Sequence, residues 1–218
     1  MPLPPVPILA SIVYHGPATR RVVAITIDDG FSPGAVLADL AILKHGHVNA
    51  TWFPIGRLVV KDPAPWRRVA AAHYPIANHT YDHALLTRRT YAQILADVTL
   101  DNEVVGRLIG EPLVPFLRPS GGMWTPSVLA AAAASGEHAV VLWNATTGDA
   151  AAMPGRSNVD DLVRNATRGT SGAIILMHAN LPNTQLALPR IIAYYRARGY
   201  AFVTLGQMFG VPGPVPYP

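Results

Sequence analysis

Residues 22–31, VVAITIDDGF, decide the fold, because an apolar run ends there in two adjacent carboxylates. The run at 22–27 is typical of a buried strand. Two like charges at the edge of a core are costly, and buried aspartate is rare unless it is paired or bound. Asp28 and Asp29 therefore indicate a functional site at the end of this strand, where Gly30 allows a turn.

Further strands and helices are predicted along the rest of the chain. Apolar runs that predict strands cover residues 48–53, 75–78, 113–118, 138–143, 173–177 and 200–205. Helical patterns cover residues 32–46, 90–110, 125–136 and 184–199, the last with an expected kink at Pro189. This alternation favours a parallel sheet. Near-continuous apolar strands and the lack of a glycine-rich phosphate loop favour a barrel, with an open doubly wound sheet as the alternative.

The composition restricts the class of protein. A chain of 218 residues, 50% hydrophobic and 14% charged, suits one domain with a large core. The net charge of +4 is scattered, without a basic run, so nucleic acid is not an expected partner. No apolar stretch reaches the roughly 18 residues of a membrane span. Cysteine is absent, so any metal must be held by histidine and carboxylate.

Both ends of the chain are rich in proline. We expect an N-terminal tail at 1–11, one domain at 12–210 and a C-terminal tail at 211–218. The first residues lack the basic head and long apolar centre of a signal peptide. The protein is then cytosolic, or a leader that preceded it has been removed.

Polar residues gather directly after the predicted strands. They are Asp28, Asp29, His79, His83, Arg118, Asp149 and His178. In a parallel barrel the carboxyl ends of the strands open on one face, where active sites are built. The sequence therefore predicts that these side chains form a single site.

The pair His79 and His83 is the first candidate for metal binding. On a helical turn, histidines four residues apart face the same way and share a cation, although most such pairs are surface or core residues. The third ligand should be a carboxylate, and Asp29 is the natural candidate. Asp28 would then lie beside the metal and take a proton from water.

Three other features have both a structural and a functional interpretation. Arg118 forms an ordinary salt bridge or orients Asp28. The glycines of SGG at 120–122 bend the chain or present N–H groups to an oxyanion. His178 is a strand-end histidine or a general acid opposite the metal.

Five motifs in this order resemble those of polysaccharide deacetylases. They are TIDDG, HTYDH, RPSGG, WNATTGD and ILMH. The resemblance, to the NodB homology domain of carbohydrate esterase family 4, extends over residues 12–210. It implies an α/β fold, a distorted (β/α) barrel of seven or eight parallel strands. It also implies a divalent metal, usually Zn²⁺ with Co²⁺ as another candidate, and hydrolysis of acetyl groups on sugars.

The resemblance also implies roles for individual residues. The metal ligands would be Asp29, His79 and His83. The catalytic groups would be Asp28 as base, Arg118 holding it, His178 as acid and Asp149 tuning its pKa. The oxyanion and acetyl pocket would be formed by the N–H of Gly121 and by Leu176 and Trp143.

The chain departs from the family pattern at several positions. Ile27 replaces the usual phenylalanine and Phe31 the usual proline. Ser120 and Gly121 replace proline and a larger residue, which predicts a more open loop. Ala150 replaces a tryptophan that walls the acetyl pocket, so we expect a wider pocket.

The leading hypothesis for function is a metal-dependent deacetylase of chitin-type or peptidoglycan-type N-acetyl glycans, or of O-acetylated xylan. The alternatives are a catalytically weak carbohydrate-binding relative and a deacetylase of a small amide. The resemblance favours a monomer that is secreted or associated with the cell wall.

Overall fold

The strand predicted from the first motif is β2 (Val22–Asp29), and every residue in it is buried. It pairs in parallel with β3 (Ala50–Pro54) on one side and β8 (Ala173–His178) on the other. The start of β2 also pairs with β9 (Ala201–Phe202). A strand with neighbours on both edges and helices on its outer face has no solvent-facing side, which explains its continuous apolar sequence.

A computed structural model describes residues 9–151, 158–180 and 182–217. Most of the predicted N-terminal tail, residues 1–8, lies outside the described residues. Ser11, the last residue assigned to that tail, instead opens β1 and pairs with Ala139.

All seven predicted strands are present, and two short strands add to them. The strands not yet named are β1 (Ser11–Val13), β4 (Ala77–Asn78), β5 (Val114–Leu117), β6 (Ala139–Val141) and β7 (Ala145–Thr146). The helices are α1 (Pro33–His45), α2 (Gly56–Lys61), α3 (Ala64–Ala71), α4 (Tyr91–Ile109), α5 (Pro126–Ala134), α6 (Val159–Ala166), α7 (Pro182–Arg196) and α8 (Leu205–Phe209). Short 3₁₀ turns lie at Leu86–Arg88, Ser120–Gly122 and Asp149–Ala151. Helix α7 continues through Pro189.

Helix starts follow from side-chain caps in the sequence. Ser32 and Thr125 accept hydrogen bonds from the backbone of the first turns of α1 and α5. Thr90 and Gln93 form a reciprocal capping box at the start of α4, and Gly110, with a φ of 88°, ends that helix. Among the described helices, none is both long enough and apolar enough to cross a membrane.

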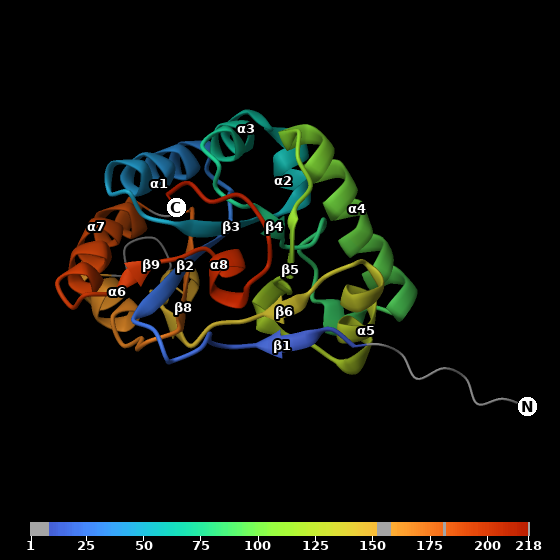
Figure 1. Cartoon of the computed structure of the whole chain (residues 1–218). Coiled ribbons are helices and arrows are strands. Elements are labelled where there is room, and N and C mark those ends of the chain that lie inside the picture. Colours follow the sequence, from blue (N-terminus) through green and yellow to red (C-terminus); the bar gives the residue numbers. More distant parts are fainter. Residues whose placement is uncertain (1–8, 152–157, 181, 218) are drawn as a thin grey trace, which may run out of the picture.

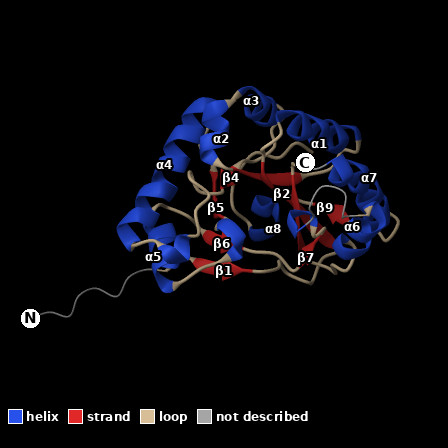
Figure 2. Cartoon of the chain, turned by 180° about the vertical axis from the view of Figure 1, so that it is seen from behind, coloured by secondary structure: helices blue, strands red, loops and turns tan. Residues whose placement is uncertain are grey.

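The strands form two parallel sheets that together make a distorted barrel (Figures 1 and 2). The orders are β1-β6-β5-β4 and β3-β2-β8-β7. A parallel bridge between Trp52 and Ile76 joins β3 to β4, and the chain passes from one sheet to the other between β6 and β7. The predicted parallel (β/α) barrel is confirmed, with the strands inside and the helices outside except for α8.

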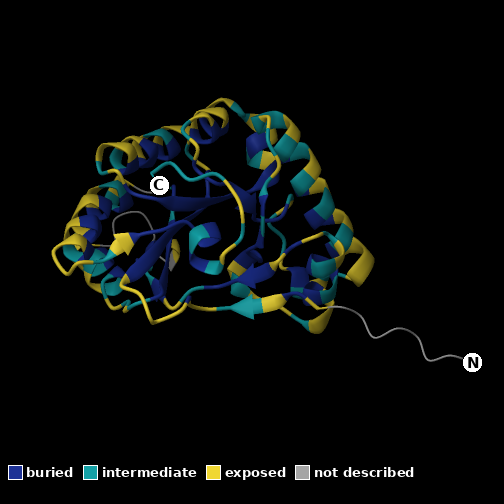
Figure 3. Cartoon of the chain, in the orientation of Figure 1, coloured by how far each residue is buried: buried dark blue, intermediate teal, exposed yellow. Residues whose placement is uncertain are grey.

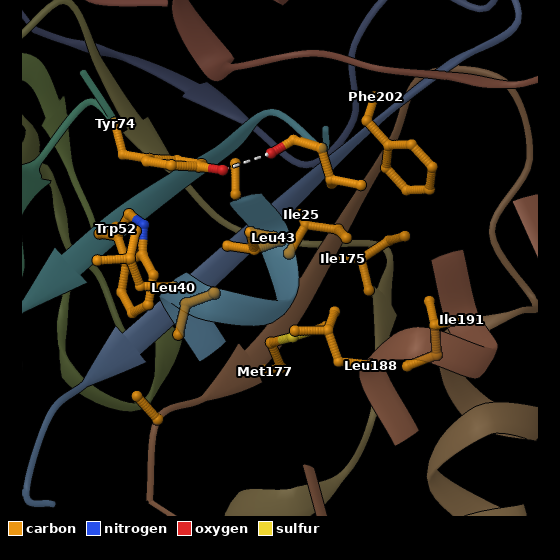
Figure 4. Packing of buried hydrophobic residues seen from close by; sticks show 14 of the residues in the cluster. Ile25, Leu40, Leu43, Trp52, Tyr74, Ile175, Met177, Leu188, Ile191 and Phe202 are labelled. Carbon is orange, nitrogen blue, oxygen red and sulfur yellow. Dashed lines mark hydrogen bonds between the residues drawn. The ribbon is translucent and has the colours of Figure 1, made fainter. Parts of the chain in front are cut away.

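Alternation along β2 separates two apolar layers. Ile25 and Ile27 face outward and pack with α1, α3 and α7, as Figure 4 shows for Ile25, Leu40 and Leu188. Val22 and Ala24 face the barrel interior. A third cluster lies beneath α4 and α5. Figure 3 shows the resulting pattern of buried strands and helices exposed on their outer sides.

Helix α8 closes the end of the barrel where the strands begin. It lies inside the ring of strands in Figure 1, and Leu205 and Met208 belong to the interior cluster. The N–H of Leu205 donates to Thr51 Oγ1, 3.0 Å away. With this end filled, the polar residues at the strand ends occupy the opposite mouth.

The segment 211–217, predicted as a tail, contacts the domain at that closed end. Asn49 Nδ2 donates to the carbonyl of Tyr217 over 2.7 Å, and the Tyr217 N–H donates to Asn49 Oδ1 over 3.0 Å. The Tyr217 hydroxyl donates to the carbonyl of Lys44, and its ring packs edge-on against His47 and Tyr74. A polar side chain before β3 therefore fixes this segment in place.

We predict that Asn49→Ala lowers the free energy of unfolding by about 1–3 kcal/mol, because both backbone groups of Tyr217 lose their partner. Urea denaturation measures the change. Glu103→Ala, on the exposed side of α4, is the control and should stay within about 0.5 kcal/mol of the parent protein. An unchanged midpoint for Asn49→Ala would contradict the fixed position of the segment.

Candidate active site

The polar residues predicted to share one face do come together at the mouth of the barrel. Asp28 and Asp29 end β2, His79 follows β4, and Arg118 follows β5. His178 ends β8 and pairs in register with Asp28. Parallel strands with a common direction place these carboxyl ends side by side.

Asp29, His79 and His83 offer three ligand atoms that lie within 4.8 Å of one another. The Nε2 atoms of His79 and His83 lie 3.4 and 3.6 Å from Asp29 Oδ1. That oxygen is buried and has no hydrogen-bond partner among the described residues. A buried carboxylate oxygen without a partner is costly, and a cation would satisfy it. The donor set, two imidazoles and a carboxylate, fits a divalent transition metal with an open position.

The charge states of these groups also suit a metal. His79 Nδ1 lies 2.7 Å from the carbonyl of Arg118, which can only accept, so Nδ1 donates and Nε2 is the nitrogen that faces Asp29. Burial, with the neighbouring His79, lowers the pKa of His83 to about 4, so its imidazole is neutral near pH 7. Burial acts to raise the pKa of Asp29, but its contacts with His79, the charge of His178 and the amide of Asn180 outweigh burial and hold it at about 2.

The two histidines meet for a reason other than the one predicted. The segment from His79 to His83 is an irregular loop, so the predicted helical turn is wrong. Thr80 and His83 have φ values of 67° and 59°, and Asp29 has 75°. Each such residue costs on the order of 1–3 kcal/mol, and strain of this kind gathers at functional sites. The rings, with centroids 4.8 Å apart, meet because the backbone turns and not because of helical periodicity.

Asp28 lies beside the three ligands and is held by Arg118, as predicted. Arg118 Nη1 donates to Asp28 Oδ1 over 2.9 Å and to Thr26 Oγ1 over 2.7 Å. The other carboxylate oxygen, Oδ2, lies 3.7 Å from His79 Nε2. Oδ1 of Asp28 is thus held by the guanidinium of Arg118, while Oδ2 faces the group formed by Asp29 and the two histidines.

His178, which is partly buried, pairs with the buried Asp149. Asp149 Oδ1 lies 2.7 Å from His178 Nδ1, and Oδ2 accepts hydrogen bonds from the His178 N–H and from Thr184 Oγ1. Burial alone would lower the pKa of His178, but the hydrogen bond and charge of Asp149, with the charges of Asp28 and Asp29, raise it to about 9. His178 therefore carries a proton near neutral pH and can donate it.

The structure also places the residues predicted for the pocket. Leu176 is buried in β8 beside Thr26 on the inward face. The guanidinium of Arg118 lies 5.6 Å from the centroid of Trp143. Gly121 is exposed on the loop after β5 with a φ of 64°, a backbone conformation that favours glycine.

Three of the five positions that depart from the family pattern lie at the surface, and the exposed Gly121 is one of them. Phe31 is 54% exposed next to the turn at Gly30, and Ala150 is exposed on the turn after Asp149. Ile27 is fully buried toward the outer helices, and Ser120 is buried.

Three polar residues of the site were not predicted. Thr26 binds Arg118, and Thr184 binds Asp149. Asn180 donates to Asp29 Oδ2 over 2.8 Å and accepts from the N–H of Phe31. A signal existed for Thr26, since it is polar within an apolar run and shares a strand face with Asp28. Asn180 gave no such signal, because an asparagine two residues after His178 is also what an ordinary loop would contain.

Together these groups can support hydrolysis. A carboxylate with one oxygen free of Arg118, a two-histidine, one-carboxylate group suited to a cation and a protonated imidazole lie around one mouth. The set provides an acceptor for a proton, a place for an electrophilic ion and a donor of a proton.

Comparisons with known proteins agree with this chemistry. A family model described as polysaccharide deacetylase matches residues 15–140. A peptidoglycan-N-acetylglucosamine deacetylase of Bacillus cereus is 30% identical over 207 residues, covering 90% of this chain and 92% of the relative. A chitooligosaccharide deacetylase of Bradyrhizobium is 31% identical over 209 residues, covering 89% and 94%. The crystal structure of a peptidoglycan N-acetylglucosamine deacetylase is similar with a TM-score of 0.86, at 28% identity, covering 94% of this chain and 95% of that one.

We predict that Asp149→Asn lowers the pKa of His178 from about 9 by roughly two units. The variant removes the negative charge that favours the protonated imidazole, so the effect of burial, which lowers the pKa, is less opposed. An NMR titration of the metal-free protein measures it. Protonated His178 stabilises the fold fully below its unfolded pKa of about 6.5, and this contribution disappears as the pH rises through 9. The stability gap between parent and variant should therefore narrow above pH 9.

Thr184→Val serves as the comparison variant, since it removes only the hydroxyl donor to Asp149 Oδ2. Its effect on the His178 pKa should be smaller than that of Asp149→Asn. If Asp149→Asn left the titration of His178 unchanged, then the contact with Asp149 would not determine the protonation of His178.

Proposed function

The chain belongs to the polysaccharide deacetylase family, and from that premise we propose that it removes the acetyl group of N-acetylglucosamine units in a peptidoglycan-type or chitin-type glycan. It is a hydrolase, and the bond it cleaves is an amide. The observation that carries the proposal is the arrangement of Asp28 beside the Asp29, His79 and His83 group. All of these groups come from one chain, in keeping with a monomer.

The proposed metal site is formed by Asp29, His79 and His83, with Zn²⁺ as the preferred ion and Co²⁺ as a substitute. When bound, such a cation would supply a Lewis acid that polarises the acetyl carbonyl and makes water more acidic. Asn180 supports the site through its bond to the second oxygen of Asp29.

Asp28 is the proposed general base. It accepts a proton from the attacking water at Oδ2, the oxygen that faces the ligand group. Arg118 donates to Oδ1 and so fixes the direction of the carboxylate. As the water oxygen bonds to the acetyl carbon, negative charge develops on the carbonyl oxygen, and the N–H of Gly121 is the proposed donor to it.

His178 is the proposed general acid. Its proton passes to the amine nitrogen as the carbon–nitrogen bond breaks, which gives acetate and a free amino sugar. Asp149 holds the imidazole through Nδ1, so Nε2 is the nitrogen that donates.

Leu176 and Trp143 are the proposed walls of the acetyl pocket. Leu176 precedes His178 by two residues in β8 and so shares its inward face. Trp143 lies beside Arg118. The resemblance puts Ala150 where family members have a tryptophan that walls this pocket, and Ala150 is small and exposed. We therefore propose that the pocket tolerates acyl groups somewhat larger than acetyl.

A binding protein without activity would not need this machinery. A buried Arg–Asp pair and a largely buried His–Asp pair are costly to keep unless they serve a reaction or a specific structure. The small-amide alternative has no supporting feature in the site. Because peptidoglycan, the substrate named for one relative, is a cell-wall polymer, we propose that the protein acts outside the cytoplasm.

The first test is release of acetate from a panel of substrates. We expect release from N-acetylglucosamine oligomers and peptidoglycan, less from acetylxylan, and loss of all release after treatment with a chelator. Added Zn²⁺ or Co²⁺ should restore the rate. No release from any acetylated glycan by metal-loaded protein would contradict the proposed function.

The second test separates the base from the ligands. We expect Asp28→Asn to bind metal normally but to lose at least a hundredfold in kcat, since the proton acceptor is gone. His79→Ala should lose metal binding itself. Calorimetric titration with Zn²⁺ and acetate release measure the two properties. A near-normal rate in Asp28→Asn would assign the base to another group.

A further inference from the structure

We propose that the buried polar face of helix α4, formed by Asp97, Asp101 and Asn102, positions the two-histidine loop (residues 78–83) for metal binding. These residues touch neither imidazole, so they are positioning residues and not ligands. The proposal rests on the metal site of the proposed function. It assigns the positioning of that site to a helix that lies outside the barrel strands.

The two-histidine loop requires outside support because of its backbone. Thr80 and His83 have backbone angles in the left-handed region, which residues other than glycine rarely adopt. Bonds within the loop shape it: the Thr80 N–H donates to Asn78 Oδ1 and the His83 N–H to Thr80 Oγ1. These local bonds fix the loop's shape but not its place relative to Asp29.

Helix α4 supplies the anchor. The N–H of Tyr81, midway between the two histidines, donates to Asp97 Oδ1 over 2.7 Å. Asn78 Nδ2 donates to the carbonyl of Val98 over 2.9 Å and to Asn102 Oδ1 over 2.8 Å. The start and the centre of the loop are therefore bonded to one face of α4, and the acceptor at the centre is a carboxylate, which makes the stronger kind of bond.

Helix α2 holds the opposite side of the same peptides. The N–H groups of Gly56 and Arg57 donate to the carbonyls of Thr80 and Tyr81, each over 3.1 Å. Tyr81 is thus bonded through its N–H to α4 and through its carbonyl to α2. Two helices from separate parts of the chain fix the centre of the loop between them.

The two helices meet closely enough to exclude a side chain. A Cβ on Gly56 would lie 2.0 Å from Asp101 Oδ1 and 2.9 Å from a ring carbon of Tyr81. Asp101 is fully buried there. The loop therefore has no room to shift toward α2, which leaves Asp97 to define its position on the other side.

The test compares metal affinity in variants that keep or remove the acceptor at position 97. Asp97→Ala removes it, whereas Asp97→Asn keeps an oxygen that can accept from Tyr81. Affinity for Zn²⁺ is measured by competition with a chromophoric chelator, and ligand geometry by the visible spectrum of the Co²⁺-loaded protein. Melting of the metal-free protein reports folding separately.

We expect Asp97→Ala to bind Zn²⁺ about 10- to 100-fold more weakly, the usual loss when a group supporting a ligand is removed. Its Co²⁺ spectrum should change, and Asp97→Asn should restore both properties to within about threefold of the parent. Glu103→Ala, an exposed acid on the same helix, is the matched control and should change neither. Asn102→Ala provides an independent variant if Asp97→Ala fails to fold.

Equal Zn²⁺ affinity and an unchanged Co²⁺ spectrum in folded Asp97→Ala and Asn102→Ala would overturn the proposal. A lower melting temperature with unchanged affinity would overturn it too, since that result assigns α4 a purely structural role. None of these readouts needs turnover, so a protein that binds metal but releases no acetate would contradict the proposed function alone. A parent protein that binds no metal would overturn both.

Discussion

The site depends most on one buried cation, the guanidinium of Arg118. It is fully buried, and its donors reach Thr26, Asp28 and the carbonyls of Val141 and Leu142. Its side chain orients Asp28, while its own backbone carbonyl fixes the ring of His79. One residue thus positions both the proposed base and a proposed ligand. Removing it would leave Asp28 as an unpaired buried charge, an effect typically worth about 3–5 kcal/mol.

Arg118 also marks a boundary in the barrel. Below it the interior is apolar, with Phe53 packed under the guanidinium at 4.4 Å, and α8 fills the far end. Above it lie the carboxylates and imidazoles. The polar groups of the mouth therefore rest on a buried apolar floor, where charges interact more strongly than in water.

There is a physical reason why the strands, and the grouping of polar residues at their ends, could be predicted from the sequence. A parallel barrel turns strand ends into neighbours, so polar residues after apolar runs, such as Asp28 and His178, could be grouped before any contact was known. The shape of the loop between His79 and His83 could not be predicted, because positive φ at Thr80 leaves no pattern in side-chain spacing. The supporting bonds from Asp97 were equally hidden, since an aspartate inside a helix is usually exposed.

The attachment of Tyr217 to Asn49 has a practical consequence. It places the end of the described chain at the base of the barrel, on the side away from the mouth. A purification tag, a surface linker or a second domain joined there would extend away from an approaching glycan strand. Immobilising the protein through that end would present the open face to an insoluble polymer, whereas coupling through the exposed Phe31 edge would obstruct it.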